Sequence, residues 1–184
     1  MELKYRQDLH TLLCPNPVVA ELGCAEGLFS ADMAKWVGKF YMVDAWRTIG
    51  TQIGDGANDT AWHEINYKNA MDRVAFAKEK ITVLRGITWE MAAEVPDSSL
   101  DMVYLDACHM EECVRKDLEA WLPKVKPMGI VAGHDFLNSS YGVGVGVRKF
   151  CKGKYELYTI EENKQEDAGF YFVNRTGRIE KCKC

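Results

Sequence analysis

The sequence predicts an α/β fold: a doubly wound, mostly parallel seven-stranded sheet with an antiparallel hairpin at its C-terminal end. Short apolar segments of strand length alternate with longer segments of helical periodicity, the pattern of repeated βα units. Glycine and acidic residues follow several of the apolar segments, where ligands bind in open parallel sheets. With 184 residues, we expect one domain over residues 1–184.

The first half of the chain is predicted to contain three strands, each followed by a connecting helix. Residues 17–22 (PVVAEL) form a nearly continuous apolar run typical of a strand buried on both faces. A helix is predicted over 27–36, and a second strand over 40–43 stops at Asp44. Residues 46–58 are rich in Gly, Thr, Asp and Asn, and a loop of this length is often functional. A helix over 62–80, a strand over 81–84 and a short helix over 88–93 follow.

The second half continues the alternation and then closes with two late strands. A strand over 100–105 ends at Asp106, and an amphipathic helix is predicted over 111–125. A turn at 127–129 leads into a strand over 130–132, which ends at His134 and Asp135. A glycine-weakened helix over 143–150 precedes the hairpin of 155–160 and 169–173. We expect Trp36 and Trp121 to belong to the core, on helix faces directed towards the sheet.

Composition favours a cytoplasmic globular protein. Hydrophobic residues make up 47% and charged residues 27%, and the net charge of −4 gives no general reason to bind nucleic acid or an anionic membrane. No apolar stretch reaches membrane-spanning length, and the N-terminal MELKYRQDLH lacks the apolar core of a signal peptide. The 7 cysteines have no framework spacing, so we expect reduced thiols. Cys182 and Cys184 are expected to be a solvated tail, because two thiols do not complete a metal site.

The turn ELGCAEGLFS carries the most functional information. Gly23 permits a sharp turn after the strand, and Gly27 would let a ligand approach the start of the helix. A dinucleotide-binding pattern would need glycines where Ala25 and Leu28 stand, and Glu26 would repel a pyrophosphate. The same carboxylate is compatible with a ligand that carries an ammonium and a sulfonium.

The spacing E-x-G-x-x-x-G after a first strand resembles the glycine motif of class I S-adenosylmethionine-dependent methyltransferases, which have a Rossmann-like fold. This resemblance implies S-adenosylmethionine as cofactor. It also implies that Asp44, 17 residues after Gly27, accepts both ribose hydroxyls. The family often has a carboxylate near the adenine, but here Ile87 stands in that segment, so adenine would be held by apolar contact and backbone groups. The implied cofactor-binding residues are Glu21, Gly23, Ala25, Glu26, Gly27, Asp44, Ala45, Trp46, Gly86, Ile87, Thr88 and Asp106.

The run from Leu100 to Phe136, LDMVYLDACHMEECVRKDLEAWLPKVKPMGIVAGHDF, resembles a branch of O-methyltransferases that act on sugars and other small molecules. In that branch the fourth strand ends in a D-G-D-H-like turn, the next helix carries D-L-x-x-W and the fifth strand ends in G-H-D. The corresponding residues here are Asp106, His109, Asp117, Leu118, Trp121, Gly133, His134 and Asp135.

Two kinds of chemistry are compatible with this resemblance. Some members of the branch hold Mg²⁺ on carboxylates, and Asp106 and Asp135 match those metal positions. However, His134 replaces another acidic residue and Cys108 replaces a candidate general base, so the donor set suits Mn²⁺ or Zn²⁺ better. Without a metal, His109 or His134 would take the proton of the acceptor. We favour the metal-free alternative, with Asp106, His109 and His134 as the catalytic residues.

The expected reaction is methyl transfer to an oxygen of a small molecule, with nitrogen acceptors left open. One alternative is a methyltransferase that acts on a protein or a nucleic acid, although the net negative charge argues against a nucleic acid. The other is an inactive cofactor-binding protein, which Cys108 would favour. Because little chain precedes the first strand, the acceptor pocket should come from the 46–62 loop, the segment after Asp135, or a second subunit in a homodimer. Four aromatic residues could line that pocket, whereas His63 is expected at the surface; the four are Trp46, Trp62, Tyr67 and Tyr141.

Overall fold

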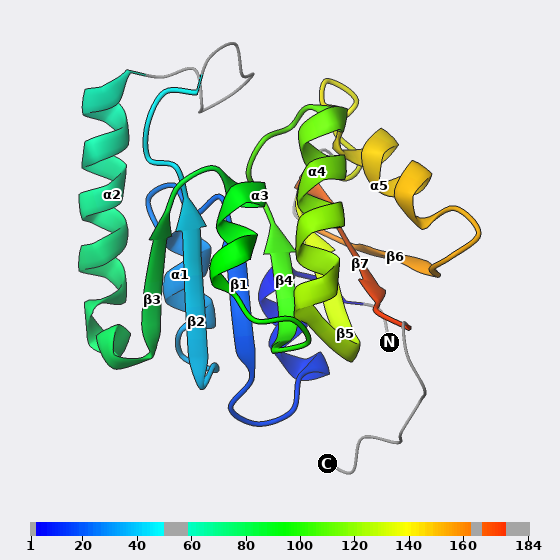
Figure 1. Ribbon diagram of the computed structural model, residues 1–184, viewed down its shortest axis with the longest axis horizontal. Coiled ribbons are helices and arrows are strands. Elements are labelled where there is room, and N and C mark those ends of the chain that lie inside the picture. Colours follow the sequence, from blue (N-terminus) through cyan, green and yellow to red (C-terminus); the bar gives the residue numbers. More distant parts are fainter. Residues whose placement is uncertain (1–2, 50–58, 163–166, 176–184) are drawn as a thin grey trace.

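A computed structural model of the chain describes residues 3–49, 59–162 and 167–175. Seven strands form one sheet in the order β3-β2-β1-β4-β5-β7-β6 (Figure 1). Neighbours from β3 to β5 pair in parallel, and β7 lies antiparallel between β5 and β6. The predicted mostly parallel sheet with its closing hairpin is therefore confirmed. The strands are β1 (Val18–Leu22), β2 (Lys39–Asp44), β3 (Ile81–Arg85), β4 (Leu100–Leu105), β5 (Val125–Gly133), β6 (Leu157–Ile160) and β7 (Gly169–Val173).

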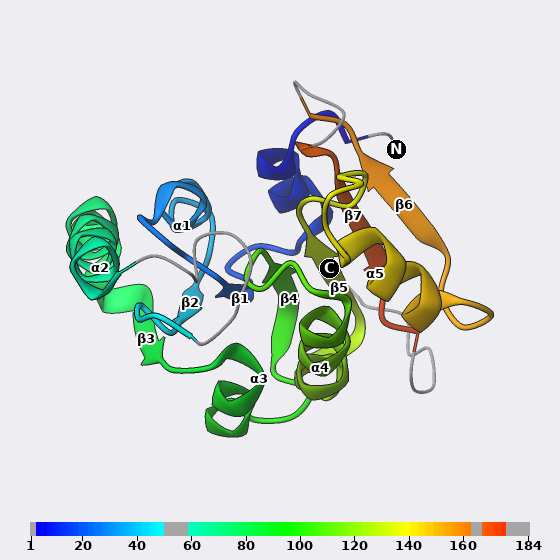
Figure 2. The same ribbon diagram turned by 90° about the horizontal axis from the view of Figure 1, so that it is seen from above.

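Helices cover both faces of the sheet, as a doubly wound fold requires (Figure 2). One face carries the 3₁₀ helix η1 (Arg6–Leu12), α1 (Leu28–Met33) and α2 (Thr60–Val74). The other carries α3 (Thr88–Met91), α4 (Glu111–Trp121) and α5 (Val143–Cys151). Short 3₁₀ helices follow α2, α3 and α4: η3 (Ala75–Lys80), η4 (Ala92–Glu94) and η5 (Leu122–Lys124).

The core consists of two apolar layers separated by the sheet, because successive residues of a strand point to opposite faces. On β4, Val103 packs in the layer that contains Leu118 and Trp121 of α4, whereas Met102 packs in the layer that contains Phe29 of α1. Trp121 is fully buried, as predicted. The central strands are therefore covered on both sides, which explains their nearly continuous apolar sequences.

Two predicted details are wrong, and one element was not predicted. Trp36 is 53% exposed and stacks on His10, because α1 ends at Met33 and Trp36 lies beyond it. The segment 127–129 is no connecting turn, since β5 runs through it with an irregular register. Asn174 supports this irregularity: its carbonyl accepts from the backbone N–H of Met128. A 3₁₀ helix, η1, precedes the first strand, where no element was expected.

The carboxyl ends of the parallel strands meet at one rim, and β1 lies between β2 and β4. At this point the chain switches from one side of the sheet to the other, which is where ligands bind in open α/β sheets. Gly23 is essential to the rim. It has φ +85°, and a Cβ there would lie 2.1 Å from the carbonyl oxygen of Asp106. The turns after β1 and β4 can therefore lie in contact only because Gly23 has no side chain.

Within the described ranges, no helix is both long and apolar enough to span a bilayer. Among the described residues, Cys24, Cys108, Cys113 and Cys151 are buried thiols. The predictions for Cys182 and Cys184, and for much of the 46–58 loop, fall outside the described residues.

Replacing Gly23 by Ala should destabilise the protein more than the same change at Gly153, which also has a positive φ but open space around its missing Cβ. Both changes incur the left-handed penalty of about 1–2 kcal/mol. Gly23→Ala adds a clash with backbone atoms, worth about 1–3 kcal/mol more. Urea unfolding of both variants measures the difference, and equal losses would contradict the close contact of the two turns.

Candidate active site

A cavity of about 460 Å³ opens at the carboxyl rim of the sheet, within the range of small-molecule and cofactor sites. It is lined by the ends of four parallel strands and by residues of η1, α1 and α2. Every residue predicted to bind the cofactor lines it except Gly27. The residues that do are Glu21, Gly23, Ala25, Glu26, Asp44, Ala45, Trp46, Gly86, Ile87, Thr88 and Asp106.

Gly27 is required for a reason that differs from the predicted one. Its φ is +80°, and a Cβ there would lie 2.8 Å from Cα of Ala70 on α2. Gly27 therefore permits close packing between the start of α1 and α2, and it is not among the residues that line the cavity. Glu26 lies at the cavity edge, where it pairs with Arg73 of α2 at 3.2 Å.

Asp44 connects the glycine turn to the segment after β2. Its Oδ2 accepts a hydrogen bond from the backbone N–H of Ala25 at 2.9 Å, and its Oδ1 accepts one from the N–H of Trp46 at 2.8 Å. The indole of Trp46 donates in turn to the carbonyl of Ala25 at 2.8 Å. Ala25 and Trp46 both have positive φ, and these contacts hold them there. Since a carboxylate has about four lone-pair sites, Asp44 retains acceptor capacity towards the cavity.

Glu21 is a buried carboxyl at the end of β1, and it accepts a hydrogen bond from the hydroxyl of Ser30 on α1. Burial raises its pKa to about 8, an effect only partly offset by the bond from Ser30. Without a ligand the group is therefore largely protonated at neutral pH. A cationic ligand in the cavity would favour its ionised form.

The segment after β3 forms the wall on the α3 side. Gly86, Ile87 and Thr88 line the cavity, and Thr88 starts α3. The carbonyl of Thr88 accepts a buried hydrogen bond from the indole of Trp121 at 2.9 Å. Burial raises the pKa of Asp117, also on α4, to about 7, against the opposing effect of Thr88. The D-L-x-x-W residues of α4 thus support the segment predicted to contact adenine.

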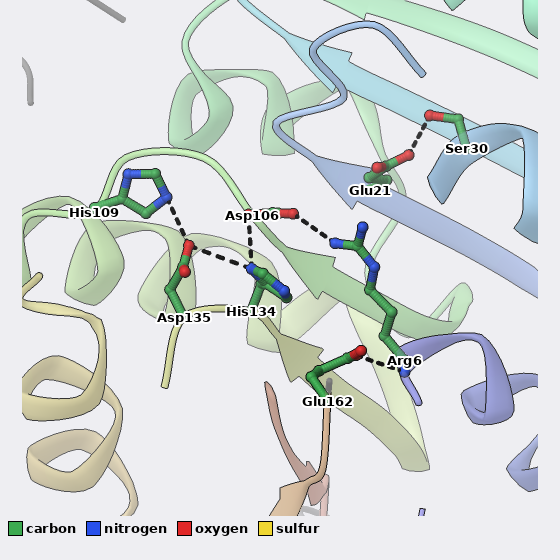
Figure 3. Close-up of polar contacts among 8 residues, drawn as sticks. All are labelled: Arg6, Glu21, Ser30, Asp106, His109, His134, Asp135 and Glu162. Carbon is green, nitrogen blue, oxygen red and sulfur yellow. Dashed lines mark hydrogen bonds and ion pairs between the residues drawn. The ribbon is translucent and has the colours of Figure 1, made fainter. Parts of the chain in front are cut away.

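Four polar residues converge where β4 and β5 end (Figure 3). Asp135 is central: its Oδ2 lies 3.0 Å from Nε2 of His109 and 3.4 Å from Nδ1 of His134. The same Nδ1 lies 3.9 Å from Oδ1 of Asp106. The second ring nitrogen of His134 points away from both carboxylates (Figure 3). The structure therefore brings the predicted catalytic set Asp106, His109 and His134 together with Asp135.

The charges of this cluster balance one another. Burial would raise the pKa of Asp135, but contacts from His109 and His134 outweigh burial and lower it below its ordinary range. Burial would likewise lower the pKa of His134, but Asp135 and Asp106 outweigh it and raise that pKa. Burial raises the pKa of Asp106, against the opposing effects of His134 and Arg6.

Arg6 is a functional candidate that the sequence analysis missed. It comes from η1, and its Nη1 lies 3.3 Å from Oδ2 of Asp106 (Figure 3). Its guanidinium also lies 5.4 Å from the ring centre of Phe29, and its backbone N–H donates to Glu162 at 2.8 Å. An isolated arginine before the first strand carries no motif that could have identified it. Only the long-range packing of η1 brings it to the rim.

Asp106, His134 and Asp135 offer one ligand atom each within 4.8 Å of one another, so their spacing would suit a metal ion. Their chemistry suits it less well. Two carboxylates and an imidazole are a poor set for Mg²⁺. Both carboxylates also already face cationic or donor groups, Arg6 on Asp106 and His109 on Asp135.

The predicted acceptor-pocket residues divide into two groups. Trp46 and Trp62 line the cavity, whereas Tyr67 contacts Trp46 and Tyr141 stacks on His109 at 4.2 Å between ring centres. His63 was expected at the surface but is only 5% exposed and lines the cavity. The reason is that it belongs to the buried stripe of α2, together with Asn66, Ala70 and Val74.

Comparison with known proteins adds a family and a set of similar structures. Residues 20–136 match the family described as a methyltransferase domain. A curated relative, the uncharacterized protein y4gI of Sinorhizobium fredii, is 29% identical over 105 residues, 57% of this chain. The chain spans only 11% of that relative's length.

Two solved structures show the same fold. A putative rRNA methylase from Clostridium thermocellum has a TM-score of 0.67 and 14% identity, covering 91% of this chain and 94% of that one. An O-methyltransferase from Bacillus cereus, in complex with SAH, has a TM-score of 0.65 and 13% identity, covering 91% of this chain and 78% of that one.

The protonated state of Glu21 has a measurable effect on stability. Its pKa is about 8 when folded against an ordinary 4.5, so the free energy of unfolding should fall as pH rises from 4.5 to 8. The slope is up to about 1.4 kcal/mol per pH unit. Glu21→Gln, which cannot ionise, should match the parent near the lower pH and exceed its stability at the upper one. Urea unfolding across this range tests it, and parallel pH profiles would rule out a neutral Glu21.

Proposed function

The chain belongs to the methyltransferase domain family, and from this premise we propose that it transfers a methyl group from S-adenosylmethionine to an oxygen of a small molecule. One observation carries the proposal: a single cavity joins Glu21, Asp44 and the 86–88 segment to the rim of the Asp106 cluster. These groups match the chemistry of the cofactor, namely an ammonium near Glu21, a ribose diol on Asp44 and an adenine against Ile87.

His134 is proposed as the general base. Oδ2 of Asp135 lies 3.4 Å from Nδ1 of His134, which favours the tautomer with its proton on Nδ1 and its free lone pair on Nε2. As the methyl group moves, its bond to sulfur breaks and a bond to the acceptor oxygen forms. The hydroxyl proton passes to Nε2, and S-adenosylhomocysteine leaves. This base takes the role that Cys108 cannot fill, which favours an active enzyme over an inactive cofactor-binding protein.

The proposed reaction needs no metal. Arg6 provides a permanent positive charge beside Asp106, and His109 occupies Asp135, so each carboxylate already has a partner. A divalent ion at Asp106, His134 and Asp135 would act as a Lewis acid on the acceptor oxygen. It would have to compete with both partners and with the orientation of His134.

A small acceptor is favoured over RNA, although one structural neighbour is named as an rRNA methylase. The net charge is −4. The described cavity lining has four acidic side chains, Glu21, Glu26, Asp44 and Asp106, of which Glu21 is kept largely protonated by burial, against two arginines, Arg6 and Arg47. This lining has no excess of positive charge that would attract a phosphate backbone. Labelled-methyl transfer to a panel of hydroxylated small molecules, with ribosomal RNA as the competing acceptor, tests this choice.

Asp44→Ala should weaken binding of S-adenosylhomocysteine about tenfold or more, because hydrogen bonds to a charged group contribute about 1.5–3 kcal/mol. Calorimetric titration of S-adenosylhomocysteine and of NAD measures it, and the parent should bind only the former. Asp101→Ala is the matched control. Its carboxylate also accepts a backbone N–H, from Val18, but at the opposite rim. Asp101→Ala should lower the stability of the protein and leave its affinity for S-adenosylhomocysteine unchanged. Equal affinity in Asp44→Ala and the parent would exclude the ribose role.

His134→Gln should lower turnover far more than cofactor affinity, since it removes the base and leaves the cofactor cavity intact. Because the pKa of His134 is raised, activity should fall as pH drops through a value above the ordinary ~6.5. EDTA should leave the activity unchanged. Methyl-transfer kinetics over pH measure all three effects, with His10→Gln, at a residue outside the cavity lining, as control. Loss of activity in EDTA that Mg²⁺ or Mn²⁺ restores would reverse the metal-free assignment.

A further inference from the structure

The charged side chains that line the cavity are unevenly distributed. Its two described arginines lie apart in the sequence and come from different elements: Arg47 follows Trp46 after β2, whereas Arg6 comes from η1. Arg6 contacts Asp106 and influences Glu21, the two carboxyl groups at the ends of β4 and β1. This end of the cavity therefore presents one cation among two acidic groups.

Arg6 is held in place but retains free donors. Its backbone is tied to Glu162, and its guanidinium lies over Phe29. The side chain is 24% exposed, so its charge is partly desolvated. The contact with Asp106 uses one nitrogen at 3.3 Å, longer than the 2.7–2.9 Å typical of a strong charge-assisted bond. A guanidinium has five N–H donors in a planar fork, so a second carboxylate can still bind.

A fixed cation beside acidic groups matches a zwitterion. An amino acid carries an ammonium and a carboxylate on one carbon, so the two charges enter the cavity together. The acidic groups Glu21 and Asp106 suit the ammonium, but neither can bind the carboxylate. Arg6 is the described cation next to them.

We propose that Arg6 binds the α-carboxylate of the cofactor's amino-acid end, while Glu21 and Asp106 face its ammonium. This assignment rests on the proposed function, because it presumes an adenosyl amino acid in the cavity. It gives η1 a role in cofactor recognition, with Arg6 as a specificity residue for the amino-acid end. Adenosine would be bound independently at the ends of β2 and β3.

The test compares two ligands by calorimetry. S-adenosylhomocysteine carries the amino-acid end, whereas 5′-methylthioadenosine keeps the adenosine and the thioether but lacks that end. Arg6→Met should weaken S-adenosylhomocysteine at least tenfold and change 5′-methylthioadenosine less than twofold, because only the first ligand has a carboxylate to lose. Unchanged binding of 5′-methylthioadenosine also demonstrates that the variant is folded.

Arg47→Met is the matched control, since it removes the other arginine of the cavity. Any change in affinity caused by Arg47→Met should be equal for S-adenosylhomocysteine and 5′-methylthioadenosine. Equal weakening of both ligands by Arg6→Met, or no weakening of either, would overturn the assignment. If the parent protein bound neither ligand, the proposed function itself would fail, and the two failures are thereby distinguished.

A ligand-side measurement keeps the proposal testable if Arg6→Met does not fold. The decarboxylated analogue of S-adenosylhomocysteine retains the ammonium and lacks only the carboxylate. The parent should bind it at least tenfold more weakly than S-adenosylhomocysteine, and Arg6→Lys should reduce this ratio. Equal binding of the two ligands to the parent would contradict a carboxylate contact.

Discussion

The parallel pairing of β1 with β2 on one side and β4 on the other is the constraint on which the whole site depends. Two backbone hydrogen bonds extend this pairing beyond the strands, from Gly23 to the carbonyl of Val43 and from Asp106 to the carbonyl of Leu22, both at 2.8 Å. Three turns are thereby fixed at one rim. Because the strands are buried on both faces, a shift of one residue in register would turn apolar side chains towards the wrong layer. The positions of Glu21, Asp44 and Asp106 follow from core packing.

Each acidic group at this rim is either neutral or compensated by a neighbouring side chain. Glu21 is kept neutral by burial, Asp106 faces Arg6, and Asp135 faces two histidines. Each acidic group thus avoids the cost of an unpaired buried charge by a different route. The result is a cavity with many ionisable groups and little uncompensated charge. Such a site can accept a ligand that carries both signs without rearranging its walls.

Much of this architecture could be predicted from sequence because local patterns determine it. The strands were predicted from the apolar runs. The position of the cavity was predicted from the ends of those runs, because the carboxyl ends of parallel strands lie at one rim of the sheet. Contacts between distant segments left no local signal. Arg6 and His63 reach the cavity, and Ser30 reaches Glu21, only through the packing of η1, α1 and α2. Gly27 illustrates the limit: the residue was noticed, but its steric partner, Ala70, could not be inferred from the sequence.

The contact between Arg6 and Glu162 joins residues 156 positions apart, and it has a consequence for the order of folding. The anchor of Arg6 cannot form until the chain has been synthesised past Glu162, because long-range closure follows local structure. During translation, the wall that contains Arg6 is therefore fixed only after all the strands from β1 to β4 have been synthesised. The cavity wall is therefore completed late in the synthesis of each molecule.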